Sequence, residues 1–172
     1  QMRRCNGSSH LCGRPYDDVV FATTHNAMSS AEREWIAPNQ GSAVPTQLAD
    51  GIRAFMVDLH LDDEGVPAFC HSSCSLGMTE LVEGWREFAV FLAENPDNVI
   101  TLILESYVSG DAIRATLNEA GLGDRLYVHP NGAPWPTLGE LIESHRQILI
   151  FTDEADNADD AQVMYVWDYA WE

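Results

Sequence analysis

Short β-rich runs alternate with helix-forming segments along the whole chain, and this alternation constrains the fold more than any other feature. The predicted strands span residues 19–24, 52–60, 67–71, 98–105, 126–129, 147–152 and, with the weakest pattern, 163–169. Residues 78–94, 112–120 and 137–144 have helical patterns, the second with Asp111 as its predicted N-cap. Such alternation predicts an α/β fold with a parallel sheet, either a closed (β/α)8 TIM-type barrel or an open doubly wound sheet. No glycine-rich phosphate loop follows the first strand, which argues against a dinucleotide-binding fold.

Length and composition predict a single domain over residues 1–172. The chain has 172 residues, of which 45% are hydrophobic, enough for one substantial core. Its longest apolar runs are far shorter than the roughly 20 residues of a membrane span. The first residues form no apolar signal segment, so we expect either no export signal or one that has been removed.

The charge of the chain is strongly negative. The chain has 27 acidic residues and nine basic residues, all of them arginine, which gives a formal net charge of −18. Such a surface repels nucleic acid and anionic membranes. We therefore expect no nucleic-acid partner and at most peripheral contact with a membrane.

The four cysteines form two local pairs in the sequence. The spacing of neither pair fits a zinc cluster, which favours two short disulfides, Cys5–Cys12 and Cys70–Cys74, although four cysteines allow three connectivities. Disulfides indicate a secreted, extracellular protein outside the reducing cytosol. Asn6-Gly7-Ser8 is a glycosylation sequon, relevant if the source is eukaryotic.

Polar or ionisable residues end each of the first four predicted strands. They are His25 and Asn26 after the first strand, Asp58 and His60 on one face of the second, His71 in the third, and Glu105 in the fourth. In a barrel these strand ends share the rim where active sites of this fold lie. One such residue alone is most simply a satisfied polar group, but four successive strands that end this way indicate a site.

This set of residues predicts phosphodiester chemistry. One histidine can accept a proton from an attacking hydroxyl while the other donates one to the leaving oxygen, because histidine titrates near neutral pH. Asn26, Asp58 and Glu105 offer only oxygen donors, which select a hard cation such as Ca²⁺ or Mg²⁺ completed by water and substrate phosphate. The cation would offset the charge that builds up on the phosphoryl group.

Six stretches, in this order and at these spacings, resemble the catalytic X-region of phosphatidylinositol-specific phospholipase C. They are ATTHNAMSS, DGIRAFMVDLHL, AFCHSSCSLG, FLAENPDNVITLILESYV, APWPTLGELI and ILIFTD. They are most similar to the secreted, disulfide-containing branch of phospholipase C-like phosphodiesterases. The resemblance covers nearly the whole chain, from Cys5 to Trp171.

The resemblance implies roles for individual residues. His25 and His71 match the catalytic pair, and Asn26, Asp58 and Glu105 match the positions that bind calcium in the metal-dependent members. Metal-independent bacterial relatives carry an arginine at the position of Asp58, so an aspartate there favours a bound cation.

The chain departs from the family pattern in two respects. Met56 stands where calcium-dependent eukaryotic enzymes carry a further acidic ligand, so we expect this site to hold its ion more weakly or with more water. A complete barrel takes roughly 250 residues. We therefore expect a distorted, incomplete barrel in this chain, with the last one or two strands missing. The remainder of a truncated or nicked chain would supply them, with a second polypeptide fragment as one form of that remainder.

Supporting residues around the site are less specific. The Cys70–Cys74 loop is expected to anchor the turn that carries His71, with a bystander disulfide as the alternative. His60 and Arg53 are candidates for contacting the metal-binding residues without binding the metal themselves. His60 is equally consistent with a packing role, and Arg53, on the opposite strand face from Asp58, is more consistent with a structural ion pair.

The leading hypothesis is a calcium-assisted phosphodiesterase that cleaves the glycerol-side P–O bond of a phospholipid. The negative charge leaves open which head group is used and whether the substrate is a lipid or a soluble phosphodiester. Two alternatives remain: a glycerophosphodiesterase or phospholipase D-like barrel enzyme, and a catalytically silent protein that binds phospholipids or phosphodiesters.

Overall fold

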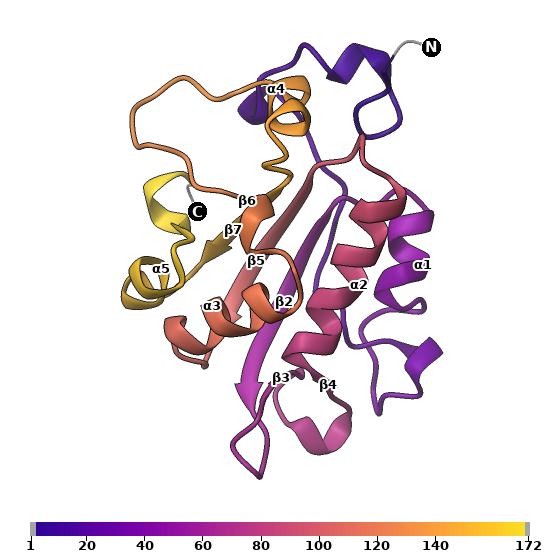
Figure 1. The fold of residues 1–172 in the computed structure, drawn as a ribbon. Helices are drawn as coiled ribbons and strands as arrows, with labels where there is room; N and C mark the ends of the chain where they lie inside the picture. The colour runs from indigo at the N-terminus through magenta and orange to yellow at the C-terminus, as the bar shows by residue number, and fades with distance from the viewer. Residues whose placement is uncertain (1–2, 171–172) are drawn as a thin grey trace.

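A computed structural model describes residues 3–170 and forms a mixed β-sheet with helices around it (Figure 1). The strands are β1 (Thr23–Thr24), β2 (Ala54–Leu61), β3 (Pro67–Phe69), β4 (Thr79–Glu80), β5 (Ile100–Ser106), β6 (Leu126–Tyr127), β7 (Ile148–Thr152) and β8 (Met164–Tyr165). The helices are α1 (Val44–Ala49), α2 (Leu81–Glu94), α3 (Gly110–Glu119), α4 (Leu138–Glu143) and α5 (Ala155–Ala161). The α/β prediction is confirmed.

The centre of the sheet is parallel. Strand β2 pairs with β1 and β5, β5 pairs with β7, and β7 pairs with β6 over its first residues and with β8 over its last. Within residues 3–170 no pairing joins β1 to β8, so the sheet stays open and does not close into a barrel. Several strands are also shorter than predicted. In each of the predicted ranges 19–24, 126–129 and 163–169, only two residues pair with a neighbouring strand.

Strand β3 breaks the predicted parallel pattern. It pairs antiparallel with both β2 and β4. A tight turn explains this direction: the Asp62 carboxylate accepts hydrogen bonds from the N–H groups of Glu64 and Val66, and Gly65 has φ 81°. So short a connection returns the chain beside β2 in the opposite direction, whereas a parallel crossover needs a dozen or more residues.

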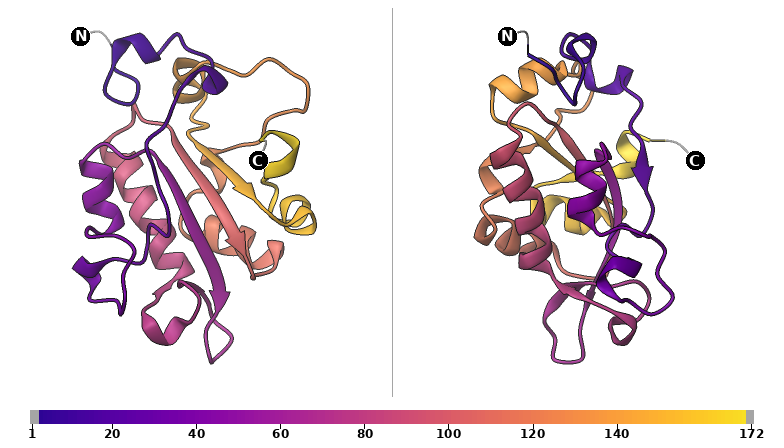
Figure 2. Two further views of the ribbon diagram at one scale, coloured as in Figure 1. Left: turned by 180° about the vertical axis from the view of Figure 1, so that it is seen from behind. Right: turned by 90° about the vertical axis from the view of Figure 1, so that its right-hand side faces the viewer.

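The main core lies between β2, β5 and the helices. Phe55, Val57 and Leu59 point to this side of β2 and are almost completely buried. The Phe55 ring packs edge-on against Phe88 of α2 with centroids 5.2 Å apart. Figure 2 (right) shows α2 on one side of the sheet and the N-terminal segment on the other. No helix within residues 3–170 is long and apolar enough to span a bilayer.

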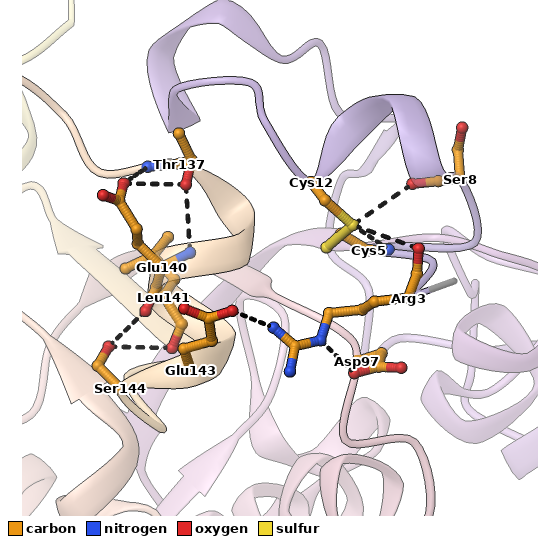
Figure 3. Close-up of polar contacts among 10 residues, drawn as sticks. All are labelled: Arg3, Cys5, Ser8, Cys12, Asp97, Thr137, Glu140, Leu141, Glu143 and Ser144. Carbon is orange, nitrogen blue, oxygen red and sulfur yellow. Dashed lines mark hydrogen bonds and ion pairs between the residues drawn. A yellow bond between two sulfur atoms is a disulfide. The ribbon is translucent and has the colours of Figure 1, made fainter. Parts of the chain in front are cut away.

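The N-terminal segment is attached to the rest of the fold by several polar contacts (Figure 3). The Cys5–Cys12 disulfide closes its loop, and the Arg3 guanidinium pairs with Asp97 at 3.4 Å and with Glu143 of α4 at 2.7 Å. The Asn6 amide donates to the Val99 carbonyl oxygen over 3.1 Å and accepts from the Val99 N–H over 2.7 Å. The loop is therefore tied to the chain that leads into β5.

The helix caps only partly follow the sequence. Ser109, and not Asp111, caps α3 by accepting a hydrogen bond from the Ala112 N–H. In α4 the Thr137 side chain accepts from the Glu140 N–H while the Glu140 carboxylate accepts from the Thr137 N–H. The prediction of Asp111 as N-cap was wrong because the helix begins two residues earlier than predicted, at Gly110.

Candidate active site

Residues from the ends of several strands line one open pocket of about 310 Å³. Its lining consists of His25, Asn26, Asp58, His60, His71, Ser72, Glu105 and Tyr107. Asp58 of β2 and Glu105 of β5 are direct partners in the parallel ladder, so both side chains leave the same face of the sheet. The structure thus brings together all five residues predicted as catalytic or metal-binding.

His71 is bound to Asp58. The His71 Nδ1 atom lies 3.0 Å from Asp58 Oδ2, and the two side chains are 41% and 10% exposed. A carboxylate at Nδ1 favours the tautomer with its proton there, which leaves Nε2 free to exchange a proton with a ligand. The sequence interpretation had given Asp58 to the cation alone and missed this contact. It arises from the antiparallel pairing of β3, in which the Cys70 N–H donates to the Asp58 carbonyl oxygen over 3.4 Å.

The turn after β1 presents His25 to solvent and buries Asn26. Asn26 is 5% exposed and has φ 50°, in the left-handed region that asparagine tolerates better than most residues. The Ala27 N–H donates to the Met56 carbonyl oxygen over 2.9 Å, which fixes the turn against β2. On the other side, Gln40 Nε2 donates to the His25 carbonyl oxygen over 2.6 Å. The His25 backbone is therefore fixed, and this exposed residue lines the pocket.

The Cys70–Cys74 disulfide closes the loop that carries His71. Cys70 is 2% exposed, so the base of the loop is anchored in the core. Within the loop the Ser73 N–H donates to the His71 carbonyl oxygen over 2.7 Å, and Ser72 has φ 65°. Because the disulfide joins residues only four positions apart, it limits the backbone conformations open to His71.

Glu105, Tyr107 and His60 form a second group in the pocket. The Tyr107 hydroxyl donates to Glu105 Oε1 over 2.7 Å, and the His60 ring stacks on the Tyr107 ring with centroids 4.6 Å apart. The hydrogen bond to Glu105 and the negative charge of that carboxylate raise the pKa of Tyr107, which keeps the phenol protonated as a donor. Tyr107 was missed by the sequence interpretation, although it stands two residues after Glu105.

The donor set suits a hard cation. Asn26, Asp58 and Glu105 contribute one amide and two carboxylates to one pocket, and all their donor atoms are oxygen. Among residues 3–170 no three His, Cys, Asp or Glu side chains form a ready-made metal cluster. An ion here would therefore depend on the Asn26 amide, water and substrate oxygens for the rest of its coordination shell.

Arg53 lies far from this pocket. Its side chain donates to Asn98 Oδ1 over 2.7 Å and to the Leu48 and Ile52 carbonyl oxygens, each over 2.7 Å. The guanidinium also lies 4.7 Å from the centre of the Phe91 ring, and burial lowers its pKa. The structure therefore gives Arg53 a structural position at the opposite end of β2, with an amide and carbonyls as partners in place of the expected ion pair.

Solved structures with a similar fold include phosphoinositol- and phosphatidylinositol-specific phospholipases C. A calcium-dependent phosphoinositol-specific phospholipase C from Pseudomonas sp. is 12% identical with a TM-score of 0.65, covering 89% of this chain and 66% of that one. The S. officinalis protein PLC21 is 17% identical with a TM-score of 0.62, covering 87% of this chain and 20% of that one. At these identities the similarity shows the fold.

Sequence comparison identifies the family. An uncharacterized secreted protein of Arthroderma benhamiae is 33% identical over 99% of this chain and 40% of its own length. A PI-PLC X domain-containing protein of Arabidopsis thaliana is 29% identical over 94% of this chain and 42% of its own length. The chain thus spans about half the length, or less, of the curated relatives it matches. The PI-PLC X family model matches residues 11–172, and the chain belongs to the PI-PLC X domain family.

Proposed function

We propose that this chain carries the catalytic site of a phosphodiesterase that cleaves the glycerol-side P–O bond of a phospholipid with two histidines and a divalent cation. The observation that carries the proposal is that His71, held by Asp58, shares one pocket with His25 and with the oxygen donors Asn26 and Glu105. Membership in the PI-PLC X family supports the reaction class.

The two histidines divide the proton transfers. His25, an exposed residue that lines the pocket, accepts the proton of the attacking hydroxyl. His71 then donates a proton from Nε2 to the leaving oxygen, while the Asp58 carboxylate at Nδ1 holds the ring in position. Asp58 is thus the residue that orients His71 in addition to being a candidate cation ligand.

In this proposal Asn26, Asp58 and Glu105 would hold the cation. When bound, it supplies positive charge that offsets the charge building up on the phosphoryl group. Met56, partly buried on the Asp58 face of β2, adds no acidic ligand, so two carboxylates carry the charge of the site. Calcium affinity decreases when a site has fewer charged ligands, and a millimolar extracellular ion matches such a site.

The negative charge of the protein limits which substrates are favourable. With a net charge of −18, the protein is repelled from an anionic bilayer unless calcium bridges the two surfaces. A phospholipid of low surface charge, a glycosyl-phosphatidylinositol or a soluble phosphodiester therefore fits better than a highly anionic membrane. The two disulfides, together with a relative named as a secreted protein, favour a location outside the reducing cytosol.

Product analysis by phosphorus NMR tests the proposal. With phosphatidylinositol in detergent and calcium, the proposal predicts a cyclic inositol phosphate, formed when the inositol 2-hydroxyl attacks phosphorus and diacylglycerol leaves. Release of the free head-group alcohol would instead select the glycerophosphodiesterase or phospholipase D-like alternative. Substrate binding without turnover, unchanged in His71→Ala, would select the silent binding protein.

A further inference from the structure

Tyr107 touches the candidate cation ligand Glu105 directly. Its hydroxyl donates to Glu105 Oε1 over 2.7 Å, while Oε2 has no hydrogen-bond partner within the described residues. The Tyr107 N–H donates to the Leu59 carbonyl oxygen over 2.9 Å, which ties this residue to the end of β2. One oxygen of the carboxylate is thus occupied by a protein donor, and the other is available to a ligand.

The Tyr107 ring is held by a stack and not by burial. Its exposed fraction is 61%, too high for the core to fix its position. His60 lies almost parallel to it, with an interplanar angle of 16° and centroids 4.6 Å apart. Because His60 stands on β2 two residues after Asp58, the stack links the ring to the strand that carries the neighbouring candidate ligand.

Glu105 needs such a restraint. Its side chain is exposed, and its neighbour across the ladder is another carboxylate, Asp58. Like charges side by side repel each other, and an exposed glutamate has many rotamers. A hydrogen bond from a neutral donor to a carboxylate reduces this freedom without removing the charge that attracts a cation.

We infer that Tyr107 is a positioning residue for the cation site: its hydroxyl holds Oε1 of the Glu105 carboxylate and leaves Oε2 for a cation, and His60 holds the Tyr107 ring in place. This inference rests on the proposed function, because it requires Glu105 to bind a divalent cation. Neither Tyr107 nor His60 is itself assigned to the ion.

Calcium titration by isothermal calorimetry tests the inference without relying on turnover. Tyr107→Phe keeps the ring and the stack but removes the hydroxyl, and we expect calcium affinity to fall about 3- to 10-fold. Tyr165→Phe is the matched control, since the Tyr165 hydroxyl makes no hydrogen bond within residues 3–170 and its ring packs against the main core. Thermal unfolding of both variants in EDTA should match that of the wild type, which separates positioning from a loss of stability.

Two further variants test whether His60 acts through Tyr107 and whether Tyr107 acts through Glu105. In a Glu105→Gln background, Tyr107→Phe should cause no additional loss of calcium affinity, because the carboxylate that it orients is gone. His60→Ala should weaken calcium binding in the wild type but not in Tyr107→Phe. Independent, additive losses would contradict a role that acts through Glu105.

The outcomes separate this inference from the proposed function. If the wild type binds calcium and Tyr107→Phe binds it equally or more tightly, the positioning role is overturned while the cation site stands. If the wild type shows no calcium binding, the cation site itself is overturned and the inference with it.

Discussion

The two ends of the central strands β2 and β5 use polar residues in opposite ways. At their N-terminal ends, here called the closed end, polar side chains form hydrogen bonds with other groups of the protein. The fully buried Gln147 donates to the Pro96 and Asn98 carbonyl oxygens and accepts from Arg125, while Arg53 donates to Asn98 Oδ1. A network satisfied in this way stabilises and orders the fold.

At the C-terminal ends, here called the open end, several polar side chains remain exposed to solvent. His25 and Glu105 are exposed, and His71 is 41% exposed although Asp58 holds it. A polar residue at a strand end therefore does not reveal its role by its position alone. Its hydrogen-bond partners decide whether it stabilises the fold or remains available to a ligand. Variants at the closed end should therefore change stability, and variants at the open end should change activity.

The largest effect is expected at the open end. His71→Ala removes the proposed acid without disturbing the core, so we expect turnover of phosphatidylinositol to fall by about 10²- to 10⁴-fold. The rate is measured from phosphorus NMR time courses, and the midpoint of thermal unfolding should stay near that of the wild type. A variant that kept wild-type turnover would remove His71 from the mechanism.

At the closed end, Arg53→Ala should reduce the free energy of unfolding by about 2–3 kcal/mol, because it leaves Asn98 and two backbone carbonyls without their charged donor. Urea unfolding measures the change. Turnover per folded molecule should remain within about twofold of the wild type, well below the roughly 10²-fold loss of a missing proton donor. A selective loss of activity in a stable Arg53→Ala protein would contradict the division between the two ends.

Asn6 extends the closed end to the N-terminal loop. Asn6→Ala removes two hydrogen bonds to the Val99 backbone, with an expected cost of about 1–2 kcal/mol in urea unfolding. Ser8→Asn is the control, since it also destroys the glycosylation sequon, keeps a side-chain acceptor for the His10 N–H and leaves the Val99 contacts intact. If the two variants lost equal stability, the Asn6–Val99 contacts would not be the cause.

The smallest effect concerns the Glu140 cap. Hydrogen bonds from Thr137 lower the pKa of Glu140, so the folded state holds the ionised form more strongly than the unfolded state does. The resulting stability is present above the unfolded-state pKa and is lost as the pH falls through the lower folded-state pKa. Glu140→Gln should therefore have a lower urea midpoint than the wild type at neutral pH, and the gap should narrow in acid. Exposed Glu94→Gln serves as control, and a gap that widened in acid would contradict this sign.

Much of the open end could be predicted from the sequence because it depends on local patterns. The period of two in β2 places Asp58 and His60 on one face, and parallel strands bring their carboxyl ends to one edge, where Glu105 joins them. These are properties of single strands and of one pairing rule, so residue spacing was sufficient to identify them.

What the sequence did not predict depends on tertiary contacts. The bond from His71 to Asp58 requires β3 to run antiparallel beside β2, which the Asp62 turn decides. The contact of Tyr107 with Glu105 depends on side-chain direction at the end of β5. The length of each two-residue strand likewise depends on which neighbours it meets, and a single sequence does not specify those neighbours.

The most direct test of the central claim is a phosphorus NMR time course of the wild-type protein with phosphatidylinositol in detergent, first with calcium and then after addition of EDTA. A site of two histidines and three oxygen ligands predicts a cyclic inositol phosphate signal that grows in calcium and stops in EDTA. Turnover that continued unchanged in EDTA would contradict the assignment of Asn26, Asp58 and Glu105 to a cation. Absence of turnover in both conditions would contradict the claim that the open end is an active site for this substrate.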